Sequence, residues 1–153
     1  MADPHPFAPF AGIWRGEGAG SYPTIDDFAY VEELTIEPVP GRPLAHWRSR
    51  TRDAASDEPR HAESGFLRAT GDGRLELVVA HGFGIVEIGT GTLDDDQLFI
   101  DSLTLAGSPS AKEVTEVQRR YRFDGTTLAY DLSMAAVGVP LTHHLSARLQ
   151  RTT

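Results

Sequence analysis

Short segments in which apolar and polar residues alternate run along almost the whole sequence, and turn-forming residues separate them. Alternation with a period of two is typical of β-strands with one buried face. No stretch shows a convincing helical period. The pairs Gly71-Asp72 and Asp124-Gly125 predict tight hairpin turns. The expected strands are residues 28–39, 43–52, 62–70, 74–82, 83–93, 97–107, 113–123, 127–137 and 141–151.

Together with an opening strand at 12–25, this pattern predicts an all-β protein of about ten antiparallel strands. Hairpin-linked strands without covering helices must bury one face and leave no bare edge, and an up-and-down β-barrel does both. A β-sandwich is the competing architecture, but the short, regular turns favour the barrel. A barrel of this size is wider than side chains alone can fill, so we expect it to enclose a ligand cavity.

The opening strand, GIWRGEGAGSYPTI, is unusually rich in glycine, with Gly12, Gly16, Gly18 and Gly20 at even spacing around Trp14. Glycine weakens a strand. Within strands it marks bends, bulges or the close approach of another backbone. We therefore expect a structural role for this segment in barrel closure, with Trp14 plugging one end and its indole N–H hydrogen-bonded.

The chain of 153 residues is long enough for one domain with a substantial core. We expect a flexible, proline-rich leader at residues 1–9 and a single barrel domain at residues 10–153. No apolar run approaches the length of a membrane-spanning helix, and the leader lacks the pattern of a signal peptide. The expected location is therefore the cytoplasm.

The absence of cysteine excludes disulfides, thiolate ligands, cysteine nucleophiles and covalent haem attachment through cysteine. The formal net charge of −8 repels phosphate backbones and anionic membranes, so neither nucleic acid nor a membrane is an expected partner. Arg48, Arg50 and Arg52 alternate along one expected strand, where they are interpreted as a solvated outer face. The sequence contains no nucleophile elbow, P-loop or dinucleotide fingerprint.

Histidines are the residues best suited to carry chemistry in this sequence. His81 ends an apolar strand at a glycine turn, which fits either a cavity mouth or a hydrogen-bonded strand end. His143 and His144 are adjacent, so they face opposite sides of a strand and cannot both bind one metal. Simple alternation places His143 inside, unless a bulge near the turn at 138–140 reverses the order. The others are His5, His46 and His61.

Several separated motifs resemble the nitrobindin family of small haem-binding β-barrels, which are related in shape to fatty-acid-binding proteins and lipocalins. They are GIWRGEGAGSYPTI, FAYVEEL, ESGFLR, AKEVTE and MAAVGVPLTHHLSARL, in the order of that family. The resemblance implies a ten-stranded barrel with one non-covalent haem b per chain. It implies that His144, in PLTHHL, is the proximal iron ligand, against the alternation rule. Lys112, in AKEV, is the candidate partner of a haem propionate.

The resemblance further implies that the protein binds nitric oxide and isomerises peroxynitrite to nitrate at ferric haem. Its partners would be these small molecules, and the chain would be a monomer or homodimer. Apolar side chains are expected to form a wall without hydrogen-bond donors on the distal side of the iron. The candidates are Leu75, Leu77, Val79, Ile85, Val86 and Met134.

Two alternatives come from other functional classes. The barrel could carry a fatty acid or other hydrophobic ligand without haem, with Arg119 or Arg148 pairing with a ligand carboxylate. It could also be a non-catalytic haem carrier or nitric oxide sensor, which needs the same pocket as an isomerase.

Overall fold

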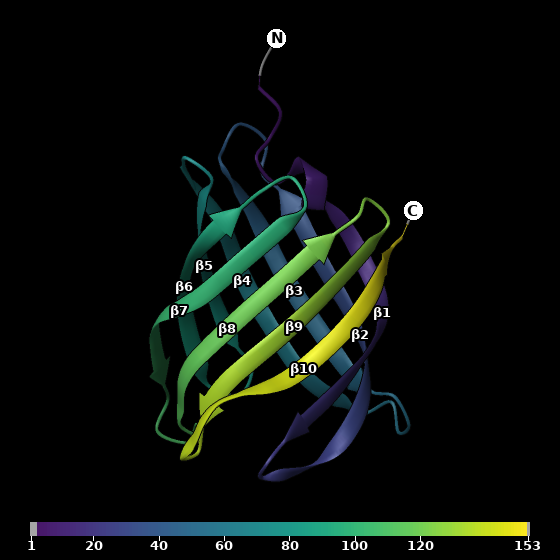
Figure 1. The fold of residues 1–153 in the computed structure, drawn as a ribbon, viewed down its shortest axis with the longest axis vertical. Helices are drawn as coiled ribbons and strands as arrows, with labels where there is room; N and C mark the ends of the chain where they lie inside the picture. The colour runs from purple at the N-terminus through teal and green to yellow at the C-terminus, as the bar shows by residue number, and fades with distance from the viewer. Residues whose placement is uncertain (1–2, 153) are drawn as a thin grey trace.

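Ten antiparallel strands form a closed barrel in the computed structural model, which describes residues 3–152 (Figure 1). Each strand pairs with its sequence neighbours, and the last strand closes on the first. The up-and-down barrel is thereby confirmed. The strands are β1 (Gly12–Tyr22), β2 (Ile25–Pro38), β3 (Leu44–Asp53), β4 (Pro59–Gly71), β5 (Arg74–His81), β6 (Ile85–Leu93), β7 (Gln97–Gly107), β8 (Val114–Phe123), β9 (Thr127–Ala136) and β10 (Val139–Arg151).

The alternating pattern becomes an inner and an outer face of the barrel wall. On β3, Trp47 and Ser49 are buried, whereas His46 and the three arginines interpreted as a solvated face are exposed. The main difference from the expected boundaries lies between β5 and β6, which were expected to be contiguous. Residues 82–84 form a turn there, and Gly84 adopts a φ of +95° that favours glycine. Within residues 3–152, no helix is long and apolar enough to cross a membrane.

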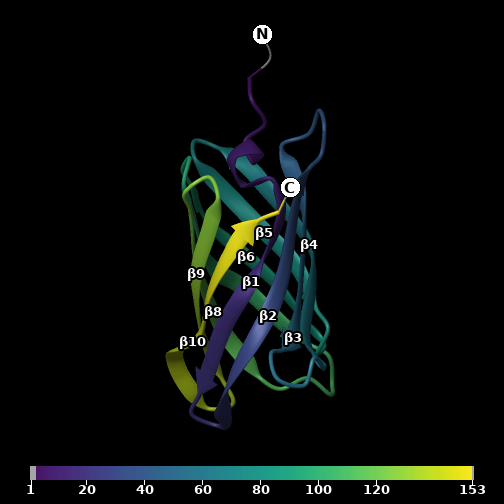
Figure 2. The same ribbon diagram turned by 90° about the vertical axis from the view of Figure 1, so that its right-hand side faces the viewer.

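The start of the chain crosses one end of the barrel (Figures 1 and 2), where its aromatic side chains are buried. A 3₁₀ turn, η1 (Ala8–Phe10), lies at this end, and Phe7, Phe10 and Trp14 are fully buried. The Trp14 indole N–H donates to the Phe10 carbonyl oxygen at 3.0 Å. The rings of Phe10 and Phe123 lie 4.5 Å apart between centroids. The plug therefore leaves the opposite end as the place where a ligand can enter.

The segment expected to be a flexible leader, residues 1–9, contributes to this plug. Its first two residues lie outside the described part of the chain, as does the last residue of the expected domain, 10–153. Phe7 is buried within it, and the His5 Nε2 atom lies 2.8 Å from the Arg42 carbonyl oxygen. The packed structure thus begins before residue 10, because Phe7 belongs to the buried core.

Glycines on β1 allow its neighbours to approach closely. A Cβ atom at Gly16 would lie 2.2 Å from the Arg148 carbonyl oxygen of β10, and one at Gly18 would lie 2.3 Å from the Tyr30 ring. Neither distance is compatible with a side chain unless the neighbouring atoms move. The seam between β1 and β10 therefore requires a bare backbone at Gly16.

We predict that Gly16→Ala lowers the free energy of unfolding by about 1–3 kcal/mol, because the added methyl group meets backbone atoms. Gly82→Ala is the control, since its Cβ would lie 3.5 Å from the nearest atom. Urea unfolding of both variants checks the prediction. Equal stabilities for the two variants would contradict it.

Candidate functional site

The open end of the barrel, opposite the plug, collects the turns that follow β1, β3, β5, β7 and β9 (Figures 1 and 2). His144 lies near the start of β10 and so belongs to this end. Lys112 lies in the β7–β8 loop at the same end, where it is exposed. No ion pair involves Lys112 within residues 3–152, so its ammonium group is available to an anionic ligand.

A β-bulge decides which of the two adjacent histidines faces inward. His143 pairs with Ser133 of β9, but the next pair in register joins Leu145 to Leu132, so His144 is an extra residue. Leu145 still packs against the core, whereas His143 is exposed and lies 2.9 Å from Asp131. The expectation from simple alternation, that His143 faces inward, is therefore wrong.

The imidazole of His144 is held in one orientation by neighbours on β1 and β2. Its Nδ1 atom lies 3.0 Å from the Ser21 carbonyl oxygen, which can only accept a hydrogen bond. Nδ1 therefore carries the proton, and Nε2 presents its lone pair. Burial lowers the pKa of His144, which favours the neutral ring that a metal requires. The Tyr22 and Phe28 rings pack against it edge-on, with centroids 5.3 and 6.2 Å away.

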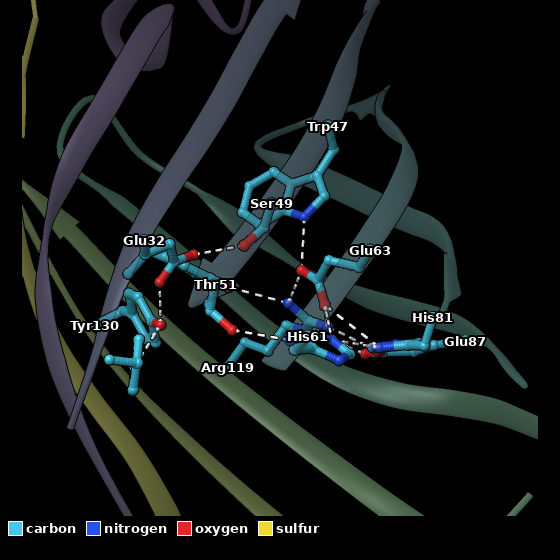
Figure 3. A network of polar contacts seen from close by, with 12 residues as sticks. Glu32, Trp47, Ser49, Thr51, His61, Glu63, His81, Glu87, Arg119 and Tyr130 are labelled. Atoms are coloured by element: carbon cyan, nitrogen blue, oxygen red, sulfur yellow. Dashed lines mark hydrogen bonds and ion pairs between the residues drawn. The ribbon is translucent and has the colours of Figure 1, made fainter. Parts of the chain in front are cut away.

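Arg119, on β8, is the centre of a buried polar network inside the barrel (Figure 3). Its Nη1 and Nη2 atoms donate to the two carboxylate oxygens of Glu63 at 2.9 and 3.0 Å. Its Nη2 and Nε atoms donate to the oxygens of Glu87 at 2.8 and 3.2 Å. Nη1 also donates to the Tyr121 hydroxyl at 3.0 Å. These contacts occupy all five N–H groups of the guanidinium.

Two carboxylates facing one guanidinium shift the pKa of each partner. Burial alone would raise the pKa of Glu63 and of Glu87, but Arg119 holds both pKa values below their usual range. Burial would lower the pKa of Arg119, and the two carboxylates raise it well above its usual value. All three groups are therefore charged. Because no donor of Arg119 is free, it is not available to pair with a fatty-acid carboxylate. Arg148, the other candidate, is exposed on the outer wall.

His81 and His61 extend this network toward the open end. His81 Nε2 lies 2.9 Å from Glu87 Oε1, and His81 Nδ1 lies 3.1 Å from His61 Nε2. The sequence suggested either a residue at the mouth of a cavity or a hydrogen-bonded strand end for His81. Both descriptions apply, since His81 is hydrogen-bonded and lies at the open end of the barrel. Sequence reasoning missed Glu63 and Glu87. Each could have been recognised in the sequence as a carboxylate on the inward, otherwise apolar face of a predicted strand.

Four of the six side chains expected to form the apolar wall are buried on β5 and at the start of β6. However, β5 runs from the plugged end to the open end, where His81 and its neighbour His61 provide hydrogen-bonding groups, so the wall there is not purely apolar. The buried members are Leu75, Leu77, Val79 and Ile85, and Met134 is half-buried. Val86 is 53% exposed, so its expected place in the wall is wrong. The reason is the alternation on β6, where Ile85 and Glu87 point inward and Val86 points outward.

A third buried carboxylate, Glu32, forms no ion pair with any of residues 3–152. It accepts hydrogen bonds from the Ser49 hydroxyl at 2.7 Å and from the Tyr130 hydroxyl. Tyr130 lies 2.7 Å from the Tyr30 hydroxyl. Burial raises the pKa of Glu32, although the hydrogen bonds from Ser49 and Tyr130 oppose this shift. Ionisation of Glu32 therefore lowers the free energy of unfolding of the barrel, and this loss of stability increases with pH.

We predict that Glu32→Gln is more stable than the wild type at pH 8 by on the order of 1 kcal/mol. The pKa of Glu32 is higher in the folded chain than in the unfolded chain. Its stabilising contribution is therefore complete when the pH is below the pKa of the unfolded chain, and it is lost as the pH rises through the pKa of the folded chain. The amide oxygen accepts one of these hydrogen bonds, its NH₂ group donates to the other hydroxyl after that hydroxyl reorients, and the amide does not ionise. Urea unfolding at pH 4 and pH 8 should show the advantage of the variant only at the higher pH.

Glu33→Gln is the matched control, because Glu33 lies next in sequence on the outer face. Hydrogen bonds from Arg15 and Arg50 lower the pKa of Glu33. Its contribution is therefore present above its unfolded pKa and lost as the pH falls, so the variant should show a small effect of opposite sign. An advantage for Glu32→Gln that is the same at both pH values would contradict the account.

A closed antiparallel barrel with a plugged end and a neutral histidine at its open end defines a small-ligand-binding barrel. The sequence profile described as "THAP4-like, heme-binding beta-barrel domain" matches residues 3–151. The chain belongs to this haem-binding family, and its resemblance to the nitrobindins is confirmed. Of the ligand types that hold haem iron, this cysteine-free site presents an imidazole with a free Nε2 lone pair, which fits the cofactor.

Relatives match the chain over nearly its whole length. "Peroxynitrite isomerase 1" of Rhodococcus jostii is 49% identical over 97% of this chain and 84% of that protein. "Peroxynitrite isomerase 2" of Mycobacterium ulcerans is 45% identical over 98% of each. The crystal structure of Rv2717c from M. tuberculosis superposes with a TM-score of 0.89 at 42% identity, covering 96% of this chain and 95% of that one.

Proposed function

We propose that this protein isomerises peroxynitrite to nitrate on a haem b held by His144. The arrangement of His144 carries the proposal: its Nδ1 is fixed on the Ser21 carbonyl oxygen and its Nε2 is free. The backbone hydrogen bond sets both the tautomer and the direction of the ring, as is usual for a metal-bound histidine. Family membership and the names of the relatives supply the cofactor and the reaction.

The reaction rearranges one anion into another, so it needs no net supply of protons or electrons. When bound, haem supplies a ferric iron that acts as a Lewis acid toward a peroxynitrite oxygen. The protein would then have to hold the iron and shield the substrate from solvent. His144 would hold the iron, and the buried side chains of Val79 and Ile85 would provide apolar surface next to His61 and His81 at the open end.

Lys112 is proposed to pair with a haem propionate, because its exposed ammonium group lies at the end of the barrel that carries His144. We also propose that nitric oxide binds reversibly at the same iron. We propose that the protein is cytoplasmic. A monomer or a homodimer is compatible with the site, which one chain completes by itself.

We predict that His144→Ala folds but loses most of its haem affinity, because the substitution removes the imidazole that would bind the iron. A titration of the haem-free chain with hemin, followed by the Soret band, measures this loss. His143→Ala is the matched control, since His143 points outward to Asp131. It should keep a sharp, stoichiometric Soret band. A loss of binding in His143→Ala with retention in His144→Ala would overturn the assignment.

Lys112→Ala should weaken haem binding only modestly, since an exposed ion pair contributes about 0–1 kcal/mol. The same hemin titration measures this change, which corresponds to a factor of about five or less in affinity. A loss as large as that of His144→Ala would show that Lys112 does more than pair with a propionate.

Peroxynitrite decay separates the proposed enzyme from a haem carrier or a nitric oxide sensor. The haem-loaded protein should convert peroxynitrite to nitrate faster than the same concentration of free hemin, with saturation by substrate. A rate no higher than that of free hemin would favour the non-catalytic alternatives.

A further inference from the structure

Three potential metal-ligating atoms meet where β4 and β5 reach the open end of the barrel (Figure 3). His61 Nε2 and His81 Nδ1 lie 3.1 Å apart. Glu63 Oε2 lies 3.4 Å from each of these nitrogen atoms. The three atoms thus form a nearly equilateral triangle, built by residues from two adjacent strands.

This triangle has the size that a four-coordinate metal ion requires. Zinc binds histidine nitrogen and carboxylate oxygen at about 2.0–2.1 Å, and tetrahedral geometry then separates the ligand atoms by about 3.3–3.4 Å. The observed separations of 3.1, 3.4 and 3.4 Å match this value. An ion above the triangle would need little movement of the side chains.

The outer contacts of these residues orient them toward such an ion. His81 Nε2 lies 2.9 Å from Glu87 Oε1, so this nitrogen carries the proton and donates it to the carboxylate. The lone pair of His81 is thereby placed on Nδ1, inside the triangle. Glu63 is held through Arg119 and through the Trp47 indole N–H, which donates to Oε1 at 2.8 Å. Carboxylate partners of this kind are common behind metal-bound histidines.

The charge balance of the cluster also favours a cation. Glu63 and Glu87 contribute two negative charges, and Arg119 contributes one positive charge, so the buried group carries an excess negative charge. A buried charge without a partner is costly. His61 is 29% exposed, so the cluster is open to solvent on one side and an ion can enter.

We propose that His61 Nε2, Glu63 Oε2 and His81 Nδ1 bind one divalent transition-metal ion of the zinc class, with water or a small anion in the fourth position. Two histidines, a carboxylate and an open position form a donor set known from catalytic zinc sites. His61 and Glu63 lie on β4 and His81 lies on β5, away from β10 in the strand order of the closed barrel. The three ligands therefore do not include His144, and the proposal does not rest on haem binding.

Cobalt titration of the metal-free, haem-free full chain tests the proposal. Calorimetry should show one saturable equivalent of Co²⁺, and the visible spectrum should develop the strong bands of four-coordinate cobalt. His61→Ala should weaken binding at least tenfold while keeping the circular dichroism of the folded barrel. His46→Ala, on the outer face of β3, and His144→Ala should both retain the affinity of the wild type.

The absence of saturable binding would overturn the site and leave the triangle as a hydrogen-bonded His61–His81 pair. Unchanged binding in His61→Ala, or loss of binding in His144→Ala, would also overturn it. X-ray absorption of the zinc-loaded wild-type chain needs no variant: the proposal requires two imidazole ligands at about 2.0–2.1 Å. A shell of oxygen ligands alone would contradict it.

Discussion

The ion-paired contact of Arg119 with Glu63 and Glu87 is the interaction on which the inside of this barrel depends. It joins β8 to β4 and β6 across the interior and uses every donor of the guanidinium. Removing one partner from such a buried group leaves an unpaired charge, at a cost of about 3–5 kcal/mol. The same carboxylates orient His81 and Trp47. The network therefore fixes the positions of the polar groups beneath the open end.

The interior of the barrel consists of successive layers, and the layers that stabilise the fold differ from the one that carries His144. Aromatic side chains led by Trp14 close one end, and the Arg119 network occupies the middle. At the open end, His144 is attached to the wall through the Ser21 carbonyl oxygen rather than through the network. The ring that would hold the iron thus depends on the pairing of β10 with β1, the seam that Gly16 allows to close.

The strands could be predicted from the sequence because burial on one face imposes a period of two, and each turn carries its own residue signature. The same rule failed at His143, because a bulge adds one residue and reverses the faces beyond it. Family resemblance placed His144 as the ligand without reference to that bulge. The cluster of His61, Glu63 and His81 could not be predicted in this way, since it depends on the register between β4 and β5.

A crystal structure of the haem-loaded protein would test the central claim most directly. The expected result is a bond from the iron to Nε2 of His144, with Nδ1 still hydrogen-bonded to the Ser21 carbonyl oxygen. The haem should lie at the open end, and one axial position should be free of protein ligands. Iron bound to His143, His61 or His81 instead of His144 would contradict the account.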